Sequence, residues 1–275
     1  MNTMQSIDNA TVLVTGGSKG IGLAIAEEFA SHGHDLILVA RGREELDRAA
    51  RGIQRKNKVK VTVFAMDLAE GNAPQRLFEQ VAQSGASVDI LVNDAGVGMS
   101  GDFAKGDYRR MTKMLKLNML ALAQLTHLFL QPMLERKRGR ILNIGSIVAY
   151  FAGAPNWSAY VASKHFVRSF SKGLSHELKG SGVAATVVSP GATATDFVQT
   201  ADTADMRAYQ ASKGPSVKQI AEVAYRACQG GKASAIPGMF NRLLAFLGEL
   251  HPRHIAFEVF AFLSRKKTRG SSLVR

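Results

Sequence analysis

Residues 10–22 read ATVLVTGGSKGIG, so an apolar, β-branched run passes directly into a glycine-rich turn. A helix-length segment follows at residues 21–32, and Gly33 stands where a helix C-cap belongs. Small residues between a strand and a helix let the backbone approach phosphate groups at the helix N-terminus. We therefore expect a strand, a turn and a helix that bind the phosphates of a dinucleotide; an ordinary flexible turn is the alternative.

The same alternation of apolar runs and helix-length segments continues to about residue 193. Further apolar runs lie at residues 35–40, 59–65, 88–93, 140–145 and 183–189, and helix-length segments lie at 44–54, 74–83 and 158–179. Strands that are apolar almost throughout suit a sheet covered on both faces. The expected fold class is α/β: a single-domain Rossmann fold whose doubly wound parallel sheet has about seven strands, with helices on both faces.

The regular alternation ends after residue 193, and the sequence shows no internal repeat or linker. We expect one domain over residues 1–275. The polar stretch at about 192–215 is predicted to be a substrate lid, because long irregular connections in compact domains are commonly binding loops. Residues 239–265 are expected to form a helical extension, and the basic residues 266–275 a disordered tail.

The composition is that of a folded globular protein, with 46% hydrophobic residues among 275. One cysteine, Cys228, excludes an internal disulfide, and residues 1–10 are polar, unlike a secretory signal. We therefore expect a cytoplasmic protein. Charged residues interrupt the apolar segment 243–263, which argues against a spanning helix. Peripheral membrane contact through the extension stays open, and packing of an amphipathic helix on its own domain is the alternative.

Lys and Arg number 35 against 22 Asp and Glu, a formal net charge of +13. This charge suits a phosphorylated cofactor, an acidic acyl carrier or anionic lipid. The basic residues are spread along the chain without a nucleic-acid-binding module, so no nucleic acid partner is expected. His251 and His254 lack the further ligands of a metal site, so no metal is expected.

The end of the second apolar run indicates which dinucleotide is bound. It reads Val39-Ala40-Arg41-Gly42-Arg43, whereas an NAD-preferring site carries an acidic residue there for the ribose 2′-hydroxyl. Arg41 can instead pair with a 2′-phosphate, and Lys19 in the glycine turn could reach the same anion. The sequence therefore favours NADP(H); the alternative is that Arg41 is a solvated charge at a helix start.

Tyr160 and Lys164 lie four residues apart on a predicted helix, so both project from the same face. A phenol, with a pKa of about 10, is a poor acid near neutral pH, and a cation one turn away lowers that pKa. The pair can therefore perform acid–base catalysis. A half-buried tyrosine beside a surface lysine is the alternative.

Taken together, these motifs resemble those of the classical short-chain dehydrogenase/reductase family, over nearly the whole chain to about residue 191. The matching features are the turn at residues 15–22, Asn93-Asp94-Ala95-Gly96, Asn118, Ser146, the pair Tyr160 and Lys164, and Pro190-Gly191. The strings Ala95-Gly96-Val97-Gly98 and Ile236-Pro237-Gly238 are also similar to a branch of the family labelled DltE-like.

The resemblance implies a catalytic set of Asn118, Ser146, Tyr160 and Lys164. Tyr160 would donate a proton to a carbonyl oxygen as NADPH delivers hydride to the carbon, and Ser146 would hydrogen-bond that oxygen. Lys164 would also bond the nicotinamide ribose, and Asn118 would hold the water of a proton relay. The implied cofactor-binding residues are Gly16, Ser18, Lys19, Gly20, Ile21, Gly22, Arg41, Asp67, Leu68, Asn93, Ala95, Gly96, Tyr160, Lys164, Pro190, Gly191, Thr193 and Thr195.

Asp94 departs from the family pattern, which usually repeats asparagine at this position. We expect its carboxylate to find a partner or to remain at the strand end, without touching the catalytic group. Its expected consequences are confined to local packing or cofactor affinity.

The expected activity is that of an NADPH-dependent carbonyl reductase, reversible as an alcohol dehydrogenase, on an apolar ketone, aldehyde or secondary alcohol. Two alternatives stay open: reduction of a 3-oxoacyl thioester on an acyl carrier, which a basic surface would favour, and a non-catalytic NADP-binding sensor. Residues 108–130, rich in Leu and Met, resemble the family helix that pairs subunits. A homodimer or homotetramer is therefore expected.

Overall fold

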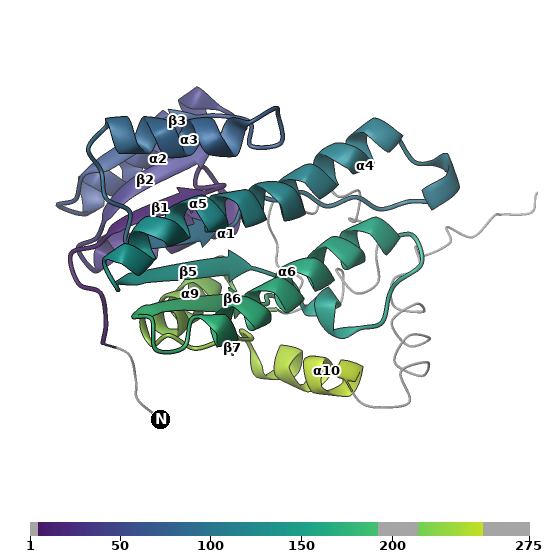
Figure 1. Cartoon of the computed structure of the whole chain (residues 1–275). Coiled ribbons are helices and arrows are strands. Elements are labelled where there is room, and N and C mark those ends of the chain that lie inside the picture. Colours follow the sequence, from purple (N-terminus) through teal and green to yellow (C-terminus); the bar gives the residue numbers. More distant parts are fainter. Residues whose placement is uncertain (1–4, 192–213, 250–275) are drawn as a thin grey trace, which may run out of the picture.

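Seven parallel strands form one sheet in the order β3-β2-β1-β4-β5-β6-β7 (Figure 1). The computed structural model describes residues 5–191 and 214–249. The strands are β1 Thr11–Thr15, β2 Asp35–Ala40, β3 Val61–Ala65, β4 Ile90–Asn93, β5 Gly139–Ile144, β6 Val183–Val188 and β7 Ser234–Ala235. The strand order reverses between β1 and β4, which is where open α/β sheets bind ligands.

Helices cover both faces of this sheet (Figure 1). Those packed on one face are α1 Gly20–Ser31, α2 Arg43–Lys56 and α9 Val217–Gln229. Those on the other are α3 Ala73–Gln83, α5 Leu122–Glu135 and α6 Ser158–Glu177. The remaining helical segments are η1 Phe103–Lys105, α4 Tyr108–Leu115, the π-helical η2 Lys116–Ala121, η3 Ile147–Tyr150 and α10 Met239–Glu249.

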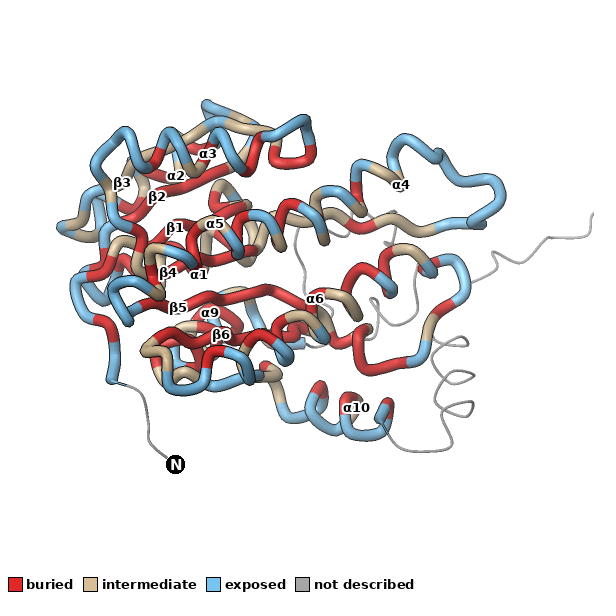
Figure 2. The backbone as a smooth tube through the Cα atoms, viewed as in Figure 1, coloured by how far each residue is buried: buried red, intermediate tan, exposed pale blue. Residues whose placement is uncertain are grey.

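The alternation of side chains along β1 explains why both faces need a cover. Val12 and Val14 pack in the core under α1, whereas Leu13 packs in the core under α5. All three are fully buried, and Figure 2 shows the buried strands between helices whose outer sides are exposed. Burial of each such side chain stabilises the fold by about 1.5 to 3 kcal/mol.

The fold class expected from the sequence is confirmed, with differences at the ends of strands. The apolar runs begin at Val59 and Val88, but pairing starts at Val61 and Ile90. Val59 and Val88 precede the paired residues but still pack against the core. The apolar pattern therefore shows which residues are buried, not which residues form hydrogen bonds with the neighbouring strand. The seventh strand, β7, has only two residues and lies outside the apolar runs.

Parts of the predicted lid and extension lie outside the described residues. These parts are 192–213 of the lid, 250–265 of the extension and the tail 266–275. The described start of the extension is α10, which packs against η3 through Ala245. Within residues 5–191 and 214–249, no helix has the length and apolar character needed to cross a membrane.

Candidate active site

The site residues expected from the sequence come together at the carboxyl ends of the strands, on both sides of the reversal between β1 and β4. Thr193 and Thr195 lie outside the described residues. The residues after β1, β2 and β3 are Gly16, Ser18, Lys19, Gly20, Ile21, Gly22, Arg41, Asp67 and Leu68; those after β4, β5 and β6 are Ala95, Gly96, Ser146, Pro190 and Gly191.

The glycine turn between β1 and α1 is built so tightly that it needs its glycines. Gly16 and Gly20 have positive φ angles of 72° and 61°, a conformation that side chains disfavour. The N–H of Gly16 donates to the carbonyl of Val39, 2.7 Å away, which fixes the turn on β2. A Cβ on Gly22 would lie 2.5 Å from the oxygen of Gly16. The turn is thus a cradle of bare backbone at the start of a helix, which fits a phosphate group.

Arg41 and Asp67 follow the neighbouring strands β2 and β3, which pair up to Ala40 and Ala65. Asp67 Oδ1 accepts the N–H of Ala69 at 3.0 Å, and Oδ2 lies 2.8 Å from Lys113 Nζ. Partial burial raises the pKa of Asp67, but the Lys113 hydrogen bond, the Ala69 N–H and the charges of Lys113 and Arg41 hold it below its ordinary value. Asp67 is therefore kept ionised by two cations, Lys113 in contact and Arg41 through its charge.

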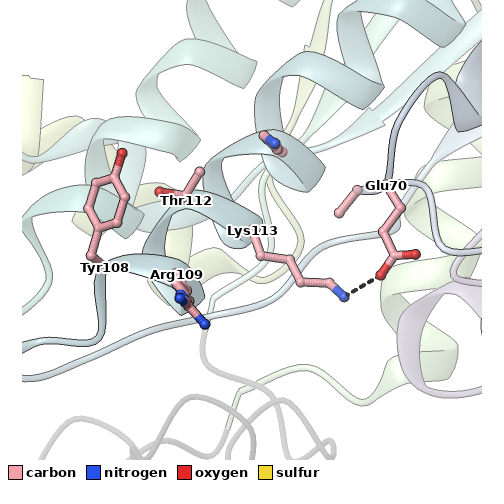
Figure 3. Close-up of a pocket in the computed structure, with 7 residues that line it drawn as sticks. Glu70, Tyr108, Arg109, Thr112 and Lys113 are labelled. Carbon is pink, nitrogen blue, oxygen red and sulfur yellow. Dashed lines mark hydrogen bonds and ion pairs between the residues drawn. The ribbon is translucent and has the colours of Figure 1, made fainter.

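Lys113 belongs to a pocket of about 290 Å³ between α4 and the segment after β3 (Figure 3). Its Nζ also lies 3.2 Å from Glu70 Oε1, and Figure 3 shows this pair among the residues that line the pocket. The residues that line it are Ala69, Glu70, Tyr108, Arg109, Thr112, Lys113 and Lys116. Sequence reasoning missed Lys113, because no local motif links α4 to the end of β3.

Asn118 lies in the π-helical segment η2, between α4 and α5. Its Oδ1 accepts the N–H of Val97 and its Nδ2 donates to the carbonyl of Val97, both at 3.0 Å. Nδ2 also lies 3.2 Å from Ser163 Oγ on α6. Wider helical turns of this kind are frequent at functional sites, and this one ties the loop after β4 to α6. The water contact expected of Asn118 stays a prediction.

Tyr160 and Lys164 lie on α6, with 5% and 8% of their surfaces exposed. Lys164 Nζ donates to the carbonyl of Ile144, at the end of β5, over 3.0 Å. The alternative of a surface lysine is therefore wrong. The Tyr160 ring packs edge-on against Trp157, with 5.5 Å between centroids, inside a cluster that includes Met114.

Ser146 follows β5 and caps η3, its Oγ accepting the N–H of Val148 at 3.4 Å. The N–H of Ile147 donates to the carbonyl of Pro190 at 2.8 Å, which joins this segment to the one after β6. A Cβ on Gly191 would lie 2.4 Å from Asn241 Oδ1, so α10 packs directly on the residues after β6. Ser146 therefore has the strand-end cap role as well as a place near α6.

Asn93 is buried at the end of β4, and its side chain joins neighbouring elements. Its Nδ2 donates to Thr126 Oγ1 at 3.1 Å and to Asn143 Oδ1 at 2.9 Å. The structure gives this side chain a part in packing; the expected cofactor contact stays a prediction.

Asp94 acts on Lys164 through its charge; the expectation that it does not touch the catalytic group stays a prediction. Its carboxylate accepts the N–H of Gly22, and burial raises its pKa to about 7, against the lowering effects of Lys164 and of that N–H. Burial in turn lowers the pKa of Lys164 to about 8, against the raising effect of Asp94. The two charges therefore act on each other.

A doubly wound parallel sheet, a glycine cradle after β1 and a buried Tyr–Lys pair across the strand reversal define a Rossmann-type oxidoreductase. The family model described as "short chain dehydrogenase" matches residues 10–215. The chain therefore belongs to the short-chain dehydrogenase family, as its resemblance implied. The similarity to the DltE-like branch stays a prediction.

Three known proteins illustrate the similarity. A short-chain dehydrogenase from Sphingobium yanoikuyae, solved with NADPH, is 31% identical, with a TM-score of 0.78 over 87% of this chain and 92% of that one. The bulky-bulky ketone specific alcohol dehydrogenase from Comamonas testosteroni is 27% identical, with a TM-score of 0.72 over 90% and 96%. The 3-oxoacyl-[acyl-carrier-protein] reductase FabG of Haemophilus influenzae is 32% identical over 68% of this chain and 75% of that protein.

Proposed function

We propose that this oxidoreductase is an NADP(H)-dependent carbonyl reductase, reversible as an alcohol dehydrogenase, acting on an apolar ketone, aldehyde or secondary alcohol. The observation that carries this proposal is the buried pair Tyr160 and Lys164 at the carboxyl end of β5. Similarity to the NADPH-bound protein from Sphingobium and to the ketone-specific enzyme from Comamonas supports the cofactor and the substrate class.

The residues present fit NADP(H). The turn from Gly16 to Gly22 leaves bare backbone at its glycines, and a Cβ on Gly22 would lie 2.5 Å from the Gly16 oxygen; such a turn suits the pyrophosphate. Arg41, which follows β2 and whose charge acts on Asp67, provides the cation for a 2′-phosphate at the adenosine edge. When bound, NADP(H) supplies or accepts the hydride.

The catalytic side chains handle the proton. Tyr160 Oη donates it to the carbonyl oxygen as the carbon accepts hydride, so that a ketone becomes a secondary alcohol. Lys164, buried one turn away, favours this transfer because its ammonium stabilises the phenolate that remains. Ser146 holds the carbonyl oxygen, and Asn118 fixes the loop of Val97 against α6.

The surroundings of Tyr160 support an apolar substrate. Its ring belongs to an apolar cluster, with Met114, Trp157 and Val161 buried and Val97, Met99 and Val148 partly buried. Apolar side chains beside the catalytic tyrosine favour an apolar group next to the substrate carbonyl.

Initial rates of NADPH oxidation over a panel of apolar ketones, aldehydes and 3-oxoacyl thioesters test the proposal. Tyr160→Phe should lower turnover at least about 100-fold while it still binds NADPH. Tyr225→Phe on α9 is the matched control, since that residue is away from the site, and it should keep wild-type rates. Turnover that survives in Tyr160→Phe would overturn the mechanism, and NADPH binding without any turnover would favour the sensor alternative.

A second candidate substrate is a 3-oxoacyl thioester on an acyl carrier. The net charge of +13 would attract an acidic carrier, and the Haemophilus relative supports this class. A carrier-bound substrate should then have a higher kcat/KM than the free thioester, by a factor that falls as salt is added. Equal values at low salt would exclude this candidate.

We also propose that α10 contacts a bilayer surface peripherally. Five large apolar side chains support this, with 45% to 84% of their surfaces exposed: Met239, Phe240, Leu243, Phe246 and Leu247. Figure 2 shows α10 exposed along most of its length. The alternative is packing on its own domain or on a second subunit. The cytoplasmic location stays a prediction.

A homodimer or homotetramer is proposed through the helical segment 108–130. Exposed Tyr108 and Leu120, at 72% and 54%, support it. Light scattering coupled to gel filtration should give a mass of two or four chains, and Leu120→Glu should lower it; a single-chain mass for the wild type would refute the proposal.

A further inference from the structure

The sheet places Asp94 between the cofactor turn and the catalytic lysine. In the register of the strands, Asn93 pairs with Thr15 of β1 on one side and with Asn143 of β5 on the other. The next residues in these three rows are Gly16, Asp94 and Ile144. Neighbouring strands lie about 4.8 Å apart. The backbone of Asp94 therefore lies between Gly16, the first glycine of the turn, and Ile144, whose carbonyl binds Lys164.

On the β1 side, Asp94 holds the glycine turn. Thr15 Oγ1 accepts the N–H groups of Asp94 and Ala95, both at 3.1 Å, which fixes the backbone. The carboxylate then reaches the turn, where it accepts the N–H of Gly22. Its Oδ2 lies 2.6 Å and 3.1 Å from where a Cβ of Gly22 or Gly16 would be. The carboxylate therefore fills the space under the turn that the glycines leave.

On the β5 side, Asp94 lies one strand away from Ile144, whose carbonyl binds Lys164. The ammonium of Lys164 donates to the carbonyl of Ile144 at 3.0 Å. A carbonyl is a neutral dipole, so it compensates the positive charge only in part. Among the described residues, Lys164 is the charged group that acts on Asp94, and Asp94 the one that acts on Lys164. The other titratable groups on that part of α6 are Tyr160 and His165, and Nδ1 of His165 lies 3.0 Å from the carbonyl of Val161. Asp94 is thus the described charge that favours the protonated form of the buried lysine.

We propose that Asp94 is a positioning residue that ties the glycine turn to Lys164, fixing the N–H of Gly22 with its carboxylate and keeping the lysine ammonium charged. The inference rests on the proposed function for its catalytic meaning. An asparagine, usual at this position in the family, would keep the acceptor for Gly22 but lose the charge. The aspartate should therefore keep the pKa of Lys164 higher than an asparagine would.

Asp94→Asn tests the charge without removing the acceptor, and Asp89→Asn is the matched control. Asp89 precedes the other end of β4, where its Oδ2 accepts the N–H of Thr11 at 3.2 Å. In Asp94→Asn the alkaline limb of the pH profile of kcat should move to lower pH by about one unit, because Lys164 loses its proton earlier. In Asp89→Asn the limb should stay where the wild type has it.

A second measurement needs neither cofactor nor substrate: the unfolding temperature is followed as a function of pH across the alkaline range. The folded pKa of Lys164, about 8, lies below its ordinary value of 10.5, so the unfolded chain binds more protons there and stability rises with pH. In Asp94→Asn this rise should begin about one unit lower, and the shift should be absent when Lys164→Met is added.

The two readouts separate the inference from the proposed function. A stability rise that begins at the same pH in Asp94→Asn and wild type overturns the inference, whatever the activity. If the rise in stability begins at lower pH in Asp94→Asn but the protein reduces no carbonyl compound, the role of Asp94 beside Lys164 is supported and the proposed reductase activity is refuted.

Discussion

Gly22→Ala is the substitution that tests most directly how closely the glycine turn fits the sheet. An added Cβ would lie 2.5 Å from the Gly16 oxygen, which is 0.9 Å inside the 3.4 Å at which ordinary contacts begin. The colliding atom is a backbone oxygen, so it cannot rotate away as a side chain can. Gly52, within α2, is the matched control because no atom lies within 4 Å of its added Cβ.

The expected changes in stability have opposite signs. Alanine is better than glycine inside a helix by about 1 kcal/mol, so Gly52→Ala should raise the unfolding temperature by about 2 to 4 °C. At residue 22, overpacking of about 1 to 3 kcal/mol opposes this gain. We expect Gly22→Ala to lower the free energy of unfolding by up to about 2 kcal/mol and the unfolding temperature by up to about 8 °C.

The assay combines thermal unfolding with titration of NADPH fluorescence. Relief of the overlap must move the Gly16 carbonyl or the Asp94 carboxylate, so the Kd for NADPH should rise at least about tenfold in Gly22→Ala, or about 1.4 kcal/mol. Gly52→Ala should keep the wild-type Kd. If Gly22→Ala is stabilised like the control and binds NADPH as tightly as the wild type, the reasoning about the turn is refuted.

Three further outcomes are expected. Arg41→Asp should raise the Kd for NADPH about tenfold or more, the worth of one charged hydrogen bond, while the Kd for NADH changes far less; equal losses would contradict the 2′-phosphate role. Burial lowers the pKa of His34 below 6.5, so stability should fall as pH drops below that value, and less so in His34→Gln; coinciding pH profiles would count against this. Phe240→Ser combined with Phe246→Ser should reduce co-sedimentation with anionic liposomes, and unchanged sedimentation would exclude α10 as the contact.

The fold was predictable because its signals are local. A strand such as β1, buried on both faces, is apolar at its three central positions, and the turn after it is marked by glycines. The short strand β7 could not be predicted in this way. Its two residues, Ser234 and Ala235, are defined by pairing with Val187 and Val188, and two residues carry no periodicity.

The site was predictable where its residues share one element, as Tyr160 and Lys164 do on α6. The interactions between elements were not, because Asp67 pairs with Lys113, and the charge of Asp94 acts on Lys164, only after the sheet and helices assemble. Asp94 was visible in the sequence as a departure from the family motif. Its effect was not, since that depends on the register that sets it beside Ile144.

The residues proposed to select the cofactor and those proposed to transfer the proton lie on opposite sides of the strand reversal. Arg41 and Asp67 follow β2 and β3, on one side of β1, whereas Tyr160 and Lys164 act at the end of β5, on the other side. Choice of cofactor and transfer of the proton should therefore vary independently: Arg41→Asp should leave the alkaline limb of kcat in place. Asp94 lies at the reversal itself, so Asp94→Asn should move that limb through the lysine. A limb that moves equally in both variants would show that the two halves are not separate.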